Sequence, residues 1–169
     1  QMLAILRSRK GCRIVPFETA KLVLTPGDTS TYSFFNYIFI PQKSFDDQSI
    51  PKEILTHELA HARQMHSLDI LFVELLTALW RFNPLLLLYR RAIRLNHEYL
   101  ADEAVLGHNK DVQAYQILIL NTLLAQRSAA LTSSFHYPFT QKRLAMMTTP
   151  INRRMHFAKK TFVSLLLPA

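Results

Sequence analysis

The sequence predicts one α+β domain that is mostly α-helical, with a small β-sheet or β-hairpin ahead of the helices. The 169 residues fit a single domain and are enough to bury a core. Three glycines against eight prolines indicate long regular elements with few flexible loops. Branched and aromatic runs come first along the chain, and apolar residues at helical spacing follow them. This order favours a small sheet packed against a set of helices.

Two short segments are predicted to be strands. Residues 21–25 (KLVLT) are rich in branched and apolar side chains and are closed by the turn-forming Pro26-Gly27-Asp28. Residues 32–40 (YSFFNYIFI) are rich in aromatic and branched side chains and end before Pro41, so one second strand is expected there. The polar residues 44–51 then connect the strands to the helices.

The first expected helix covers residues 51–66. Ser49 is its expected N-cap, Pro51 suits the first turn, and Glu53 lies where a negative charge interacts favourably with the helix dipole. The apolar positions recur at three- and four-residue spacings and so predict one buried face: Ile54, Leu55, Leu59, Ala62 and Met65.

Four more helices are expected after it. The break at Asn83-Pro84 separates the second from the third, and Gly107 is the expected end of the third. The predicted ranges are residues 68–81, 84–106, 111–127 and 140–147.

Residues 68–88 are apolar enough to raise the question of a membrane span. Asp69, Glu74 and Arg81 interrupt the stretch, as does the Asn83-Pro84 break. A charge near the bilayer centre costs about 2.5–3.5 kcal/mol. We therefore expect buried or membrane-surface helices here.

The segment His57-Glu58-Leu59-Ala60-His61 is an H-E-x-x-H motif inside the best-supported helix. Residues four apart lie on one helical face, so the two imidazoles can hold one tetrahedral zinc ion. Glu58 is offset by one residue and is expected to act as the base that takes a proton from the attacking water. The alternative is a chance motif on an ordinary helix.

A catalytic zinc ion needs a third protein ligand, and Glu98 is the expected one. Asp102 lies four residues later on the same face, where it can accept a hydrogen bond from the far nitrogen of a ligand histidine. His66 and His97 are alternative third ligands. The other interpretation of this cluster is a solvated acidic turn that pairs with Arg91 and Arg94.

A second group should stabilise the oxyanion during peptide hydrolysis. His136 and Arg143 are the candidates, with Tyr137 and Tyr99 as weaker ones. The strand at residues 32–40 can also dock an extended substrate along its free edge.

The formal charge of +8 is concentrated towards the two ends of the chain. Residues 1–16 are basic and are expected to form a juxtamembrane segment. Basic residues also precede the apolar residues 161–167, which are too few to span a bilayer. We therefore expect residues 159–169 to begin a truncated membrane helix, and the chain to be a piece of a larger membrane protein. Cys12 is the single cysteine, which excludes an internal disulfide and fits a reducing compartment.

Residues 57–106 resemble the core of the BlaR/MecR-type antirepressor metallopeptidases, which are bacterial membrane proteins. The matching features are the H-E-x-x-H motif, the segment Trp80-Arg81-Phe82-Asn83-Pro84, which is close to the family's W-F-N-P with one extra residue, and the pair Glu98 and Asp102. Upstream, residues 32–40 resemble the strand before the active-site helix, and downstream Lys142-Arg143-Leu144 resembles the family's K-R-I.

The resemblance implies a zincin-like fold of the gluzincin type over residues 17–158, with Glu98 as the third zinc ligand. It implies a domain that faces the cytoplasm at the bacterial inner membrane and cleaves a transcriptional repressor, or its own chain, in response to a signal. No β-lactam-sensing domain is present in these 169 residues.

Three other functions compete with this one. Membrane prenyl-protein and HtpX-type quality-control peptidases share H-E-x-x-H with a later E-x-x-x-D. A signalling module can keep the fold without catalysis, although Glu58 has no use in a purely structural zinc site. A basic DNA-binding module is disfavoured because the helices lack a stripe of Lys and Arg interleaved with base-reading residues, so no direct nucleic-acid contact is expected.

Overall fold

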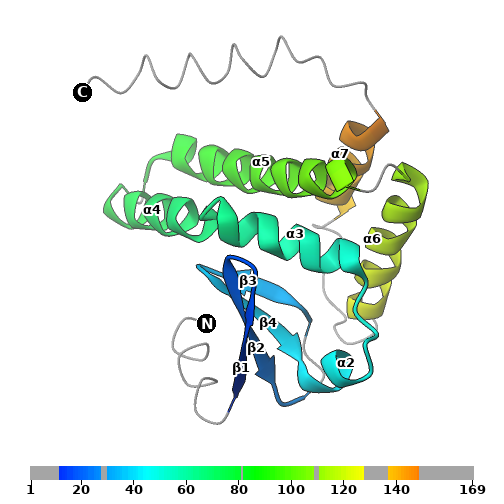
Figure 1. Cartoon of the computed structure of the whole chain (residues 1–169). Helices are drawn as coiled ribbons and strands as arrows, with labels where there is room; N and C mark the ends of the chain where they lie inside the picture. Colours follow the sequence, from blue (N-terminus) through cyan, green and yellow to red (C-terminus); the bar gives the residue numbers. More distant parts are fainter. Residues whose placement is uncertain (1–11, 28–29, 81, 109–110, 128–136, 149–169) are drawn as a thin grey trace.

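The computed structural model describes residues 12–27, 30–80, 82–108, 111–127 and 137–148. A small sheet lies against one side of helix α3, and helix α5 runs along the other side of α3 (Figure 1). Helices α6 and α7 close one end of this arrangement. The chain is therefore α+β and mostly helical, as the sequence predicts.

The sheet has four strands in the order β1-β2-β4-β3. Strand β2 (Ala20–Thr25) pairs antiparallel with β1 (Arg13–Phe17) and parallel with β4 (Tyr37–Pro41). Strand β3 (Tyr32–Phe34) pairs antiparallel with β4 and forms one edge of the sheet.

Two predictions about the strands are corrected. The expected single strand at residues 32–40 is a tight hairpin, because Phe35 adopts a left-handed backbone with φ 50° and reverses the chain between β3 and β4. Residues 13–16, which we assigned to the juxtamembrane segment, form strand β1 together with Phe17 and pair with β2. The sheet therefore begins before the expected domain boundary at residue 17.

A short helix, α2 (Gln42–Asp46), occupies part of the expected polar connection, and α3 (Lys52–Arg63) follows it. Pro51 is the N-cap of α3, so the prediction of Ser49 as the N-cap is wrong. The Ser49 hydroxyl instead donates to the Ser44 carbonyl over 3.3 Å.

The main hydrophobic core lies between α3 and the sheet. Its fully buried members come from β2, β4 and α3: Ala20, Leu22, Leu24, Ile38, Ile40, Leu59 and Ala62. Burial of this face fixes the rotation of α3. The same rotation turns the H-E-x-x-H residues towards β3 and α5.

Helix α3 ends at a kink, and α4 (His66–Leu79) continues beyond it. Met65 takes a left-handed backbone with φ 54° at this point. Asn83 then caps α5 (Pro84–His108) by accepting from the Leu85 N–H over 3.0 Å. Helix α5 runs through Gly107, so the predicted stop at that glycine is wrong.

A second core joins the remaining helices α6 (Val112–Arg127) and α7 (Tyr137–Thr148) to α5. Its buried members are Val105, Tyr115, Ile119 and Met147. In the part of the chain that the structure describes, no helix is both long and apolar enough to cross a bilayer.

Candidate metal centre

The three predicted metal ligands converge between α3 and α5. The Nε2 atoms of His57 and His61 lie 3.2 Å apart. Glu98 of α5 places one carboxylate oxygen 3.6 Å from His57 Nε2 and the other 3.7 Å from His61 Nε2. Among the described residues, these three form a group whose ligand atoms all lie within 4.8 Å of one another.

These distances fit a tetrahedral zinc site. Zinc–nitrogen and zinc–oxygen bonds of about 2.0–2.1 Å place neighbouring tetrahedral ligands about 3.3 Å apart. The separations of 3.2, 3.6 and 3.7 Å come close to that value. Two imidazoles and one carboxylate also leave the fourth position open, as in catalytic sites.

His57 is held from behind by Asp102 and Tyr115. The His57 Nδ1–H lies 3.2 Å from a carboxylate oxygen of Asp102 and 3.0 Å from the Tyr115 hydroxyl. The hydroxyl donates to that same Asp102 oxygen over 2.8 Å. When the ring is neutral, donation from Nδ1 leaves Nε2 as the unprotonated nitrogen, which is the form that binds a metal.

Arg143 ties α7 to both acidic residues of the centre. Its Nε and Nη2 donate to the two oxygens of Asp102 over 2.8 and 2.6 Å, and its Nη1 lies 2.8 Å from Glu98. Asp102 is fully buried, so this bidentate pairing compensates for the loss of its hydration.

His61 is held by a second, separate chain of hydrogen bonds. Its Nδ1 lies 2.7 Å from Nδ1 of His66, whose Nε2 lies 3.1 Å from the Gln64 side-chain oxygen. An amide oxygen only accepts, so His66 donates from Nε2 and its Nδ1 accepts from His61. His61 Nε2 is then free to bind a metal.

His97 lies next to this chain and is not part of the ligand cluster. Its ring stacks on His66 with centroids 3.8 Å apart, and its Nε2 lies 2.9 Å from Asp69. Of the two alternative third ligands, His66 therefore supports His61 and His97 supports His66.

Glu58 lies beside the ligands and hydrogen-bonds to Ser33 of β3. Burial raises the pKa of its carboxyl group, while the neighbouring His57 and the Ser33 hydroxyl oppose that change. A base with a raised pKa holds a proton more readily near neutral pH than an exposed glutamate does.

Three side chains of the centre have strongly shifted pKa values. Burial alone would lower the pKa of His57, but its bonds to Asp102 and Glu98 outweigh burial and raise it to about 9. Burial and the charge of His57 lower the pKa of His61 to about 4. Burial would raise the pKa of Glu98, but His57 and Arg143 bring it down to about 2. Titratable groups perturbed in this way cluster at functional sites.

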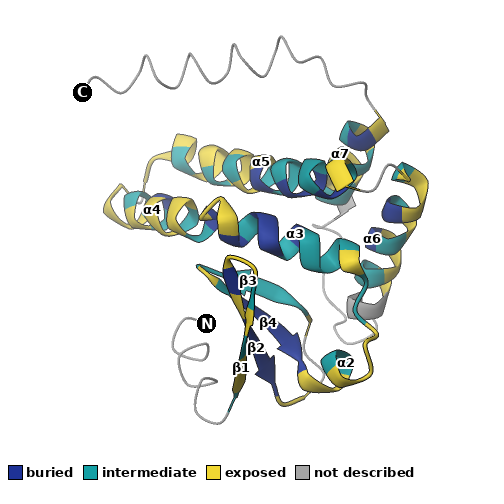
Figure 2. Cartoon of the chain, viewed as in Figure 1, coloured by how far each residue is buried: buried dark blue, intermediate teal, exposed yellow. Residues whose placement is uncertain are grey.

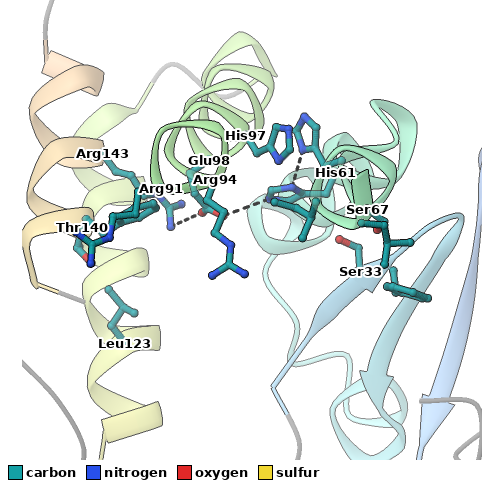
Figure 3. A pocket seen from close by; sticks show the side chains of 15 residues that line it. Ser33, His61, Ser67, Arg91, Arg94, His97, Glu98, Leu123, Thr140 and Arg143 are labelled. Atoms are coloured by element: carbon teal, nitrogen blue, oxygen red, sulfur yellow. Dashed lines mark hydrogen bonds and ion pairs between the residues drawn. The ribbon is translucent and has the colours of Figure 1, made fainter. Parts of the chain in front are cut away.

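The centre opens into a cleft of about 620 Å³ (Figure 3). Strand β3 supplies one side of it, α4 and α5 supply the middle, and α6 and α7 supply the far side. The residues that line it include Ser33, Phe34, His61, Ser67, Arg91, Glu98, Leu123, Thr140 and Arg143. Its volume lies within the range usual for ligand-binding clefts.

Of the oxyanion candidates, Arg143 lies in the cleft, as just described. His136 lies outside the described residues, and of Tyr137 the structure describes the backbone at the start of α7. Tyr115 and Ser33 contact the site but were not predicted. No local motif marks either of them, because α6 and β3 meet α3 through long-range packing.

The comparisons with curated proteins and with solved structures found no match. The family model described as BlaR1 peptidase M56 matches residues 21–157, which is most of the chain. That range contains β2 from its second residue, β4, the three clustered residues, Asp102 and Arg143. The chain therefore belongs to the BlaR1 peptidase M56 family and is a peptidase domain of the BlaR1 type.

Proposed function

We propose that this domain is a zinc-dependent endopeptidase with a zincin-like fold of the gluzincin type. The observation that carries the proposal is the near-tetrahedral spacing of His57, His61 and Glu98, with Glu58 half-buried beside them. A structural zinc site is closed by four protein ligands, whereas three ligands next to a carboxylate form the arrangement of a hydrolytic site.

The roles of the residues follow from their positions. A zinc ion, when bound, supplies Lewis acidity that polarises a carbonyl group and makes water easier to deprotonate. Glu58 accepts the proton of the attacking water and then delivers it to the leaving amine. Asp102, Tyr115 and His66 hold the two imidazoles in the tautomer that presents Nε2 to the metal.

Strand β3 is the proposed docking edge for the substrate backbone. It is the last strand of the sheet, and Ser33 and Phe34 both line the cleft. An extended peptide that pairs with this edge would cross the metal centre with chain on either side of the cleaved bond. That geometry favours an endopeptidase.

Arg143 is better suited to positioning than to binding the oxyanion. Its guanidinium already contacts both oxygens of Asp102 and one of Glu98. We therefore assign Arg143 the role of orienting Glu98, and His136 remains a prediction for the oxyanion.

We also propose that the substrate is a cytoplasmic repressor or the protein's own chain, and that the domain acts at the inner face of a bacterial cytoplasmic membrane. The support is the match to the BlaR1 peptidase M56 family, together with the resemblance of residues 57–106 to the antirepressor metallopeptidases and the basic residues near both ends of the chain.

The test is zinc content and cleavage of a candidate repressor, measured for the wild type and for Glu58→Gln. We expect Glu58→Gln to keep zinc and to lose cleavage, including any self-cleavage. Glu53→Gln is the matched control, because it makes the same change on the same helix but outside the centre. If Glu58→Gln still cleaves, the assigned base is wrong. If zinc binds but the wild type cleaves neither a repressor nor itself, the non-catalytic signalling module is the better interpretation.

A further inference from the structure

The tip of the hairpin formed by α4 and α5 exposes a dense group of large apolar side chains. Phe82 is 96% exposed, and Leu85 and Leu79 are 68% and 66% exposed. Other members more than half exposed are Leu75, Trp80, Leu88 and Tyr89. Figure 2 shows this end of the two helices as mostly exposed, at the opposite end of α5 from α7. Exposed apolar groups of this size mark interaction sites.

Charged groups border this tip on one side. Between residues 75 and 89 the sequence has a single charged residue, Arg81. Immediately behind this stretch, Glu74 of α4 pairs with Arg90 over 2.7 Å and with Arg94 over 3.2 Å, both on α5. Arg91 lies beside them and is exposed.

The depth of the part beyond Glu74 and Arg90, in which Arg81 is the single charged residue, matches the boundary region of a bilayer. Glu74 lies five residues before the end of α4, and Arg90 lies six residues after the start of α5. At about 1.5 Å per residue, the tip extends about 7–9 Å beyond Glu74 and Arg90. Interfacial segments bury their apolar side about 5–10 Å into the headgroup and acyl-chain boundary.

We propose that this tip inserts into the surface of a lipid bilayer. Trp80 and Tyr89 are of the types that gather at membrane interfaces, and the arginines behind the tip suit anionic headgroups. The tip protrudes from the end of a helical hairpin, which suits a fluid lipid layer better than a protein partner that needs a complementary groove (Figure 1). This attachment belongs to the domain itself and is additional to any flanking membrane helix.

Insertion would also orient the cleft. Ile70 and Leu71 of α4, and Arg91 and Arg94 of α5, line the cleft and belong to the same hairpin. The cleft would then open close to the lipid surface. If the proposed peptidase function holds, its substrates would be chain segments held near the membrane, whereas insertion itself does not depend on that function.

Trp80 is the only tryptophan of the chain, so its fluorescence reports on the tip alone. The experiment mixes the full chain with vesicles of phosphatidylcholine and phosphatidylglycerol in equal amounts, and with vesicles of phosphatidylcholine alone. We expect a blue shift of the emission and quenching by lipids brominated on the acyl chain, both stronger with the anionic vesicles. Because the signal comes from Trp80, binding through the basic ends of the chain would not mimic it.

The variant Phe82→Ser with Leu85→Ser removes two exposed side chains and should leave the fold intact. It should weaken the Trp80 response to vesicles by about tenfold or more. The matched control is Ile117→Ser with Leu124→Ser on α6, where the side chains are 57% and 60% exposed. The control should respond to vesicles as the wild type does.

Three results would overturn the proposal. One is an unchanged Trp80 emission with both kinds of vesicle. Another is an equal weakening of the Trp80 response to vesicles in the tip variant and in the α6 control. The third is a Trp80 already shielded from acrylamide without lipid, which would show that another segment or a second copy of the chain covers the tip.

Discussion

Replacing Arg143 with methionine should destabilise the domain strongly, because it leaves the buried charge of Asp102 without its main partner. Asp102 is 0% exposed and accepts from Arg143 over 2.8 and 2.6 Å. Breaking a buried ion pair by removing one partner costs about 3–5 kcal/mol. That is a large part of the total of about 5–15 kcal/mol typical of a domain.

The assay is urea unfolding in the presence of a chelator, so that metal binding does not contribute. A matched control is Arg63→Met, since Arg63 contacts Glu18 at 2.6 Å but the two side chains are 49% and 51% exposed. An exposed pair contributes about 0–1 kcal/mol. If both variants lose the same free energy of unfolding, then burial does not determine how much an ion pair contributes to stability, and the argument is refuted.

A double variant separates a lost charge partner from a lost packing contact. Arg143→Met combined with Asp102→Asn removes the buried charge as well, so it should recover part of the stability lost in Arg143→Met. If the two losses simply add, Asp102 is not held as a charged group by Arg143.

Two more substitutions test how the ligands are held. His66→Ala removes a support of His61 and should lower the affinity for zinc about 10–100-fold. Glu98→Ala removes a proposed ligand and should lower the affinity far more. Competition with a chelator measures both affinities, and equal losses would overturn the assignment of the third ligand. Tyr115→Phe keeps the buried ring but loses its hydrogen bond to Asp102, so the free energy of unfolding in urea should fall by about 1.5–3 kcal/mol. An unchanged free energy would mean that this hydrogen bond makes no net contribution to stability.

The sequence predicts the parts of the site that depend on helical spacing. His57 and His61 are one turn apart on α3, as are Glu98 and Asp102 on α5, so each pair shares a face in any straight helix. The structure places His57, His61 and Glu98 together with Asp102 behind them.

The remaining contacts depend on how distant segments pack. Tyr115 is 58 residues from His57, and the two meet because α6 packs beside α5 through Tyr115 and Val105. The hairpin between β3 and β4 turns at Phe35, a residue type that rarely takes positive φ, so the residue type does not predict the turn. In β1, Arg13 and Pro16 obscure the alternation of apolar and polar residues that is typical of a strand. The strand is recognised from its pairing with β2.

The contacts of Arg143 also couple the metal centre mechanically to α7. Three contacts of 2.6–2.8 Å join this helix to Asp102 and Glu98. N–H···O bonds usually have donor–acceptor distances up to about 3.2 Å, so a displacement of α7 by about 1 Å that the Arg143 side chain did not follow would lengthen these contacts beyond that range. Helix α7 ends at Thr148, and the chain continues from there into its basic residues and the apolar run at 161–167. The chain that follows α7 is therefore linked to the proposed ligand Glu98 both through Arg143 and through the packing of α7 on α5.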